Sequence, residues 1–193
     1  ISLNPNFEYD FVKVPNGEIY VLAKELVASV MKTAGIDSWE VLATVLGSDL
    51  ELIKTKHPLF DRDSLVITGD HVTLDAGTGC VHTAPGFGAD DFIVCQRYNI
   101  PIIVPVDGKG RHTAESGKYE GMFVDDSNEV ILKDLDDCGA LLATEDIVHS
   151  YPHCWRCKNP IIFRTTEQWF CSVDALKDDA VKACEDIKWI PGW

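Results

Sequence analysis

The chain has 193 residues, of which 46% are hydrophobic and 25% charged, and its formal net charge at pH 7 is −14. This composition is ordinary for a folded domain, but the net charge argues against an autonomous nucleic-acid binder, which usually carries a basic face. No apolar run is long enough to span a bilayer and no signal peptide is visible, so the sequence predicts a cytoplasmic protein without a membrane role.

The first half of the chain alternates short extended runs with one helical pattern. The runs 7–14 and 18–22 flank a Pro-Asn-Gly turn, which predicts a β-hairpin. Apolar residues from Leu26 to Met31 fall at helical spacing, and Gly35 ends that helix. Four further strands are expected, at 39–46, 51–57, 64–68 and 71–75. So many short strands predict a mixed α/β fold built on a closed or nearly closed β-barrel, with peripheral helices.

The second half contains more helix and loop. Helices are expected at 89–98, at 127–138 with a cap at Asp126 or Ser127, and at 174–186. The run 100–106 predicts a buried strand whose prolines favour an edge or a bulge. The other predicted segments are a mobile surface loop at 107–121, a strand region at 140–150 and a compact turn unit at 151–164. We divide the chain into a core at 1–148 and a return linker at 149–193.

The most informative stretch runs from Asp75 to Asp91 and reads DAGTGCVHTAPGFGADD. Glycines permit tight turns and close approach of the backbone, and acidic residues suit the first turn of a helix. A polar His-Thr pair between two glycine-rich turns is unusual for a core. The pattern therefore predicts the wall of a small-molecule pocket.

The extended motif DHVTLDAGTGCVHTAPGFGADDF resembles the editing domain inserted into isoleucyl-tRNA synthetases. The segments YPHCWRCKNPIIFRTTEQWF and KWIPGW resemble those by which that insertion returns to the catalytic domain. Sister domains of the valyl and leucyl enzymes share the GTG turn and an acidic pair, but usually not the VHTAPG sequence. The resemblance implies hydrolysis of valine wrongly esterified to the isoleucine tRNA, and it implies the tRNA 3′ end and the catalytic and tRNA-binding parts of a parent chain as partners.

The same resemblance assigns roles to individual residues. Asp91 would bind the α-ammonium of the substrate, and His82 would lie beside its side chain and scissile ester. The turn Gly77, Thr78, Gly79 would line the pocket. Without the resemblance, the favoured interpretation of Asp91 is a first-turn acid that only offsets the helix dipole, and that of His82 is a buried, hydrogen-bonded structural histidine. Thr83 is either a pocket hydroxyl or a plain strand residue.

Two departures from the family pattern affect these expectations. Many relatives have a histidine where this chain has Phe87, so that position is assigned no chemistry. The family's threonine-rich strand is expected just before the sequence ISLNPN, outside this chain. No Ser-His-Asp or Cys-His pattern is legible, which predicts direct attack by water without a cofactor. An ATP site is expected only in the catalytic part of the parent protein.

The seven cysteines are odd in number and irregular in spacing, which argues against a disulfide framework. Cys154 and Cys157 have the two-residue spacing of a zinc knuckle, but one pair is half of a tetrahedral site. The resemblance implies that a second pair outside this chain completes a structural zinc site in the parent. A redox role is the alternative, although no thioredoxin-like pattern surrounds the pair.

The sequence is compatible with three other functions. The chain could be a valyl-type editing domain that clears threonine, a non-catalytic insertion that positions tRNA, or a zinc-dependent structural adaptor. Three basic residues, Lys109, Arg111 and Lys118, could touch tRNA phosphate or simply form a solvated loop. The net charge of −14 speaks against the positioning module.

Overall fold

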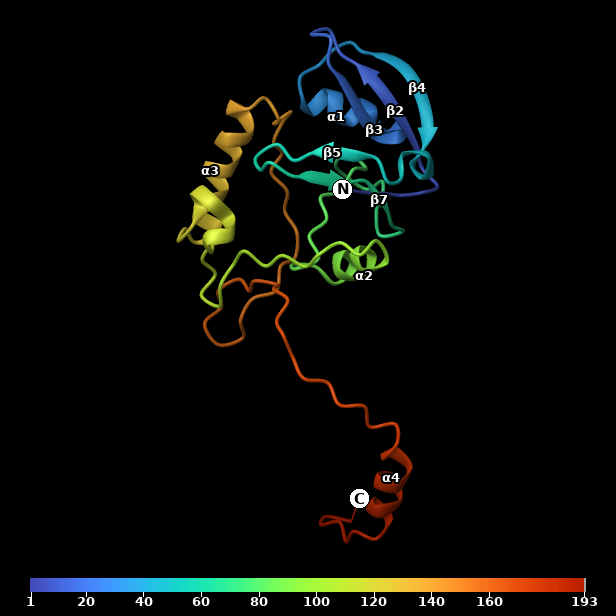
Figure 1. Ribbon diagram of the computed structural model, residues 1–193, viewed down its shortest axis with the longest axis vertical. Coiled ribbons are helices and arrows are strands. Elements are labelled where there is room, and N and C mark those ends of the chain that lie inside the picture. Colours follow the sequence, from blue (N-terminus) through green and yellow to red (C-terminus); the bar gives the residue numbers. More distant parts are fainter. Residues whose placement is uncertain (193) are drawn as a thin grey trace.

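The N-terminal part is a three-stranded antiparallel sheet in the order β3–β2–β4 (Figure 1). Its strands are β2 Glu8–Lys13, β3 Ile19–Ala23 and β4 Glu40–Leu46. The short 3₁₀ helix η1 (Lys24–Leu26) leads into helix α1 (Val27–Thr33). The computed structural model in which we describe this fold covers residues 1–192, so Trp193, the last residue of KWIPGW, lies outside the described residues.

Four short strands form two further sheets. β1 (Ser2–Leu3) runs parallel to β7 (Ile67–Thr68), and β5 (Lys54–Lys56) pairs with β6 (Asp63–Leu65) in antiparallel fashion. The 3₁₀ helix η2 (Gly47–Leu50) joins β4 to this region. The mixed helix-and-sheet class is confirmed, but within residues 1–192 the three sheets do not close into a barrel. Strands of two or three residues form too few ladder hydrogen bonds to link the sheets into a ring.

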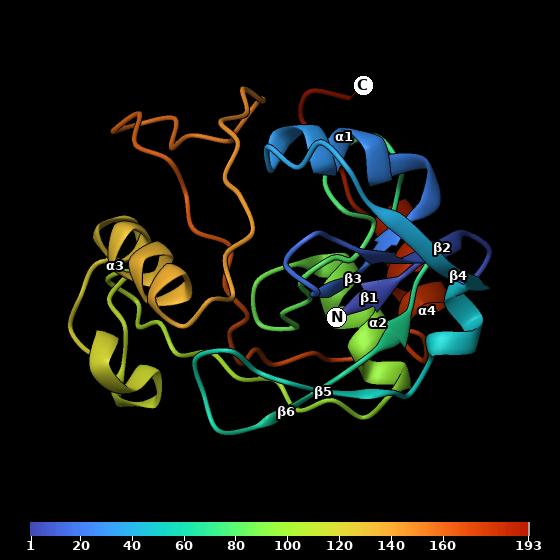
Figure 2. The ribbon, with the colours of Figure 1, turned by 90° about the horizontal axis from the view of Figure 1, so that it is seen from above.

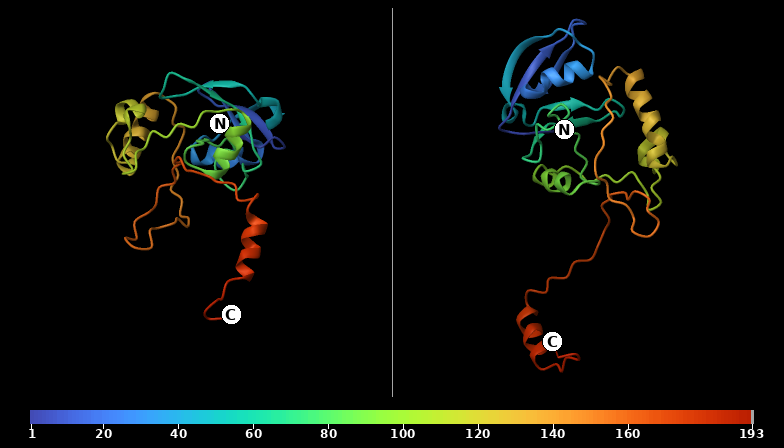
Figure 3. Two further views of the ribbon diagram at one scale, coloured as in Figure 1. Left: turned by 60° about the horizontal axis from the view of Figure 1, so that its bottom comes forward. Right: turned by 180° about the vertical axis from the view of Figure 1, so that it is seen from behind.

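The second half carries the remaining helices. They are α2 (Ala89–Arg97), the 3₁₀ helix η3 (Ala114–Tyr119), α3 (Val124–Asp137) and α4 (Lys177–Glu185). Figure 2, which looks at the molecule from above, separates α3 and the extended chain after it from the sheets. Figures 1 and 3 agree that α4 lies apart from the rest, and α4 has no buried residue. Among residues 1–192, no helix has the length and apolar character needed to span a bilayer.

Three predicted strands are wrong. The run 71–75 is irregular, because Val72 is buried in a loop whose carbonyl accepts a hydrogen bond from the Asn4 side chain. The run 100–106 contains two prolines that cannot donate to a ladder, and Ile102 and Ile103 are exposed. The region 140–150 forms no strand, and Val148 lies fully in solvent.

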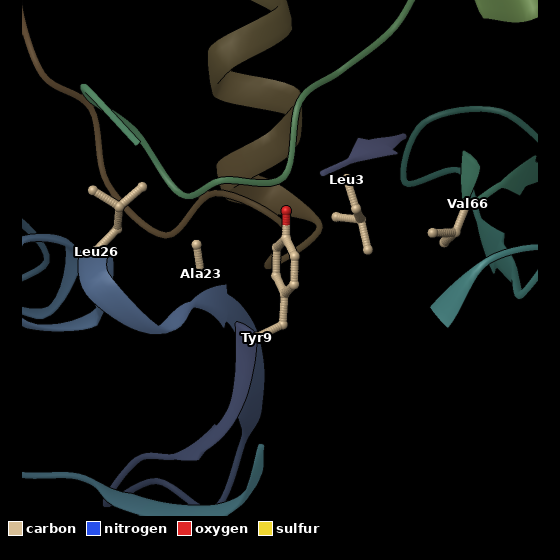
Figure 4. Packing of buried hydrophobic residues seen from close by; sticks show 5 residues of the cluster. All are labelled: Leu3, Tyr9, Ala23, Leu26 and Val66. Atoms are coloured by element: carbon tan, nitrogen blue, oxygen red, sulfur yellow. The ribbon is translucent and has the colours of Figure 1, made fainter. Parts of the chain in front are cut away.

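Two clusters of buried side chains hold the sheet in place. In the first, Leu3, Tyr9, Ala23, Leu26 and Val66 pack together beneath the loop that follows β7 (Figure 4). In the second, α1 packs on the sheet through a set of aliphatic side chains, namely Val12, Val14, Leu22, Val27 and Met31. Each fully buried aliphatic side chain contributes about 1.5–3 kcal/mol, so this sheet is a firm support for the loop above it.

Candidate functional site

The Gly77-Thr78-Gly79 turn is mounted directly on the end of β3. The Ala23 amide donates a hydrogen bond of 2.9 Å to the Thr78 carbonyl. Both glycines have positive φ, +76° and +73°. A Cβ on Gly79 would lie 2.4 Å from the Ala23 Cβ, whereas a Cβ on Gly77 would meet nothing within 4 Å. The predicted turn is therefore present, and its second glycine is required twice, for conformation and for space.

The side chains after this turn are engaged within the protein. The Thr78 hydroxyl accepts from the Cys80 amide at 3.2 Å and donates to the Cys80 carbonyl at 3.1 Å. The Cys80 thiol donates to the Val21 carbonyl at 3.4 Å, and burial raises its pKa to about 11. A thiol that stays protonated near neutral pH is a poor nucleophile, so Cys80 is a structural residue.

The residues Val81 to Thr83 form a short pairing with the start of the chain. Ser2 and Val81 exchange two backbone hydrogen bonds of 2.8 and 2.9 Å. The Thr83 hydroxyl lies 2.6 Å from the Ser2 hydroxyl. Ser2 was not predicted as a partner, since nothing local to Thr83 signals it.

His82 is exposed, but atoms around its ring displace water and lower its pKa from the ordinary 6.5. Among the charges, the N-terminal ammonium lowers the pKa of His82 further, the Asp91 carboxylate raises it, and the Arg62 guanidinium lowers it. The pKa of His57, on the turn between β5 and β6, is lowered mainly by burial. His82 is therefore largely neutral at pH 7 and can accept a proton or a hydrogen bond.

Asp91 lies in the first turn of α2. A Cβ on Gly88 would meet the Asp91 Oδ2 at 2.5 Å, so this carboxylate folds back over the beginning of the helix. The three ion pairs found among residues 1–192 do not include Asp91. Asp90 is exposed and one residue away on the helix, about 100° around its axis. Asp91 is therefore half-buried at the start of α2 and forms no ion pair among residues 1–192.

The C-terminal segment touches this region at the turn before α2. The Thr165 amide donates to the Gly86 carbonyl at 2.8 Å, and the Thr165 hydroxyl donates to the Pro85 carbonyl at 3.3 Å. This contact was missed in the sequence, because the two segments lie about eighty residues apart. The proposed boundary between 148 and 149 stays a prediction.

Two hollows in the surface are not lined by the predicted site residues. The larger measures about 570 Å³ and is lined by aromatic rings of Phe87, Phe123, Tyr151 and Phe163. The smaller measures about 240 Å³ and lies beside Phe7 and Lys24. Phe87, to which the sequence assigned no chemistry, thus contributes to the larger hollow, while Asp91 and His82 line neither.

Cys154 and Cys157 occupy a tight turn closed by two backbone hydrogen bonds, Cys154 to Asn159 at 2.8 Å and Lys158 to Cys154 at 2.9 Å. Backbone N–H groups of Cys157 and Arg156 point at the Cys154 sulfur and lower its pKa. This favours the thiolate, the form that binds zinc. Among residues 1–192 no three His, Cys, Asp or Glu side chains gather as metal ligands, and the half zinc site stays a prediction.

The family model described as tRNA synthetases class I (I, L, M and V) matches residues 9–193. The chain belongs to the class I tRNA synthetase family. Two relatives of this synthetase chain are isoleucine–tRNA ligases, 58% identical in Caldicellulosiruptor saccharolyticus and 53% identical in Bacillus cereus strain AH187, each over 193 residues. These matches cover 100% of the chain and 21% of each relative, so the chain spans about a fifth of their length. The resemblance to isoleucyl-tRNA synthetases is thereby confirmed.

A solved structure is also similar to this synthetase chain. The crystal structure described as GlLeuRS-CP1 has a TM-score of 0.42 and 20% sequence identity, covering 52% of the chain and 43% of that structure.

Proposed function

We propose that the chain is the editing part of an isoleucyl-tRNA synthetase and hydrolyses the ester of valine wrongly attached to the isoleucine tRNA. The observation that carries this proposal is the Asp91 carboxylate, which lies half-buried in the first turn of α2 and has no cation partner among residues 1–192. A half-buried carboxylate without a cation partner suits a substrate that carries an α-ammonium.

The need for such a site is energetic. One methylene in a hydrophobic pocket separates valine from isoleucine by only about 1–3 kcal/mol, a limit for which isoleucyl enzymes are themselves the standard example. A second site that admits valine and excludes isoleucine by size supplies the remaining selectivity. The glycine turn at 77–79 is the wall that we assign to this exclusion.

The chemistry requires little from the protein beyond positioning. Asp91 holds the α-ammonium, and His82 orients a water molecule toward the ester carbonyl and shapes the pocket. Backbone N–H groups within 77–84 stabilise the developing oxyanion. The protonated thiol of Cys80 argues against a covalent intermediate, which supports direct attack by water. Thr83 contributes through its contact with Ser2 and not through a free hydroxyl.

Cofactors enter only through the parent protein. Cys154 and Cys157 would hold a structural zinc together with ligands outside this chain, and ester cleavage does not use it. ATP belongs to amino-acid activation in the catalytic part. A cytoplasmic location follows from this role and stays a prediction.

The test is deacylation of valyl- and isoleucyl-tRNA by the parent synthetase, with aminoacylation as the control for folding. Losing a charge-assisted contact costs about 1.5–3 kcal/mol, so Asp91→Ala should lower kcat/KM for valyl-tRNA by roughly 10- to 150-fold. The matched variant Asp90→Ala removes a neighbouring acid and should stay within about twofold of the wild type. Normal hydrolysis by Asp91→Ala would remove the ammonium anchor from the mechanism.

The two alternatives give different results in the same assay. A valyl-type editing domain would clear threonine from tRNA in preference to valine. A positioning module would leave hydrolysis unchanged when the insertion is deleted.

A further inference from the structure

Tyr9 connects the core of the sheet to the glycine turn. It is completely buried on β2, and Figure 4 shows its ring standing upright from the strand with the hydroxyl directed at the loop above. This hydroxyl donates a hydrogen bond of 2.8 Å to the Gly79 carbonyl and accepts one of 2.9 Å from the backbone N–H of Asn4. A phenol has one proton to donate, so both contacts are made in a single orientation.

The ring has little room to move. A Cβ on Gly47 would lie 2.9 Å from a ring carbon of Tyr9, so the backbone of η2 confines the ring on that side. Burial also raises the pKa of Tyr9, so the hydroxyl keeps its proton near neutral pH. The donor that faces Gly79 is fixed by packing as well as by hydrogen bonds.

Two adjacent carbonyls of the turn are thus anchored to the same sheet. The Ala23 amide binds the Thr78 carbonyl and Tyr9 binds the Gly79 carbonyl, at 2.9 and 2.8 Å. A turn held by one hydrogen bond could rotate about it. Two hydrogen bonds to the sheet fix both the height and the tilt of the turn. The position of the turn also determines where the next residues, Cys80 to Thr83, lie.

We propose that Tyr9 is a positioning residue that sets the size limit of the editing pocket by holding the Gly77-Thr78-Gly79 wall at a fixed height. This inference rests on the proposed function, because it concerns which ester enters that site. Tyr9 does not touch the substrate and acts through the Gly79 carbonyl.

The experiment compares Tyr9→Phe with the wild type in the parent synthetase, measuring hydrolysis of valyl- and isoleucyl-tRNA. Misplacement of a site by about 1 Å can cost a hundredfold in rate, so a smaller shift should lower kcat for valyl-tRNA by roughly tenfold. The ratio of the valyl- to the isoleucyl-tRNA hydrolysis rate should also change, because a wall no longer held at a fixed height does not keep one size limit. A domain that is merely destabilised would lose both activities together.

Val12→Ala is the matched control, since Val12 is also fully buried on β2 but packs in the other cluster. It should leave the ratio of the two hydrolysis rates unchanged. If Tyr9→Phe behaves like Val12→Ala, or leaves both rates unchanged, the inference is overturned. If the wild type does not hydrolyse valyl-tRNA, or Asp91→Ala has no effect, the proposed function fails first.

A second variant covers the case in which Tyr9→Phe does not fold. Tyr9→4-aminophenylalanine keeps an N–H donor toward the Gly79 carbonyl, so its rate ratio should stay within about twofold of the wild type. A tenfold change in that ratio, in a protein that still aminoacylates normally, would also overturn the inference.

Discussion

Substituting Gly79 by alanine should lower the free energy of unfolding and disrupt the packing of the glycine turn on β3. A residue other than glycine in the left-handed region costs about 1–2 kcal/mol. The new Cβ would also lie 2.4 Å from the Ala23 Cβ, and forcing extra volume into a packed contact costs about 1–3 kcal/mol. The total of about 2–5 kcal/mol is a large share of the roughly 5–15 kcal/mol that stabilises a typical domain.

Gly77→Ala separates the two contributions. Gly77 has nearly the same φ, +76° against +73°, but open space around its Cβ position. Both substitutions stiffen the unfolded chain to the same extent, so that effect cancels between them. We expect Gly79→Ala to be less stable than Gly77→Ala by about 1–3 kcal/mol, the cost of the contact alone.

The assay is urea unfolding of the chain, combined with hydrogen exchange at the Ala23 amide, which donates to the turn. Ala23→Gly removes the atom that a Cβ at position 79 would strike. In that background, changing Gly79 to alanine should cost no more than changing Gly77, and the coupling should appear as a double-mutant interaction energy. Equal costs for Gly77→Ala and Gly79→Ala in the wild-type background would refute the reasoning.

Three further predictions concern titration and metal binding. Because the pKa of His82 lies below 6.5, valyl-tRNA hydrolysis should rise with pH below that value and stay flat above it, and His82→Gln should flatten the rise in a pH–rate profile. In the metal-free chain at pH 7.5, iodoacetamide should modify Cys154 well before Cys80, as followed by mass spectrometry, because the pKa of Cys154 is lowered and that of Cys80 is about 11. In the parent synthetase, Cys154→Ser or Cys157→Ser should remove one zinc, as measured by elemental analysis, and should leave the hydrolytic rate per folded molecule unchanged. A rate loss larger than the loss of folded protein would contradict a purely structural zinc.

The elements with strong local signals could be predicted from the sequence. The hairpin of β2 and β3, the helix α1 and the helix α2 were found within a few residues, because apolar spacing and glycine positions specify them. The run 100–106 failed because its apolar residues suggested burial, whereas two prolines leave it without a ladder and partly exposed. Closure into a barrel failed for a related reason, since strand number predicts it only when the strands are long enough to pair.

The residues of the site could be predicted from the sequence, but the contacts that hold them in place could not. The glycines of the turn, His82 and Asp91 stand within fifteen residues of one another, so the motif could be read directly. The contacts that fix them come from far along the chain: Tyr9 binds the turn, and Ser2 binds the segment that carries Thr83. No local pattern links residues seventy or eighty positions apart, and single-sequence reasoning therefore cannot supply these contacts.

The charge of the chain is informative under the proposed function. A net charge of −14 repels a phosphate backbone, yet the substrate is esterified to RNA. The same field favours the one cationic group on that substrate, its α-ammonium, and Asp91 concentrates this attraction at one point. Such a site repels the tRNA and attracts the α-ammonium of the esterified amino acid. It would therefore bind the RNA weakly on its own and release the cleaved product readily. Most of the affinity for tRNA must then come from other parts of the parent protein, so raising the salt concentration should weaken tRNA binding by the parent far more than binding of a free aminoacyl ester by this chain.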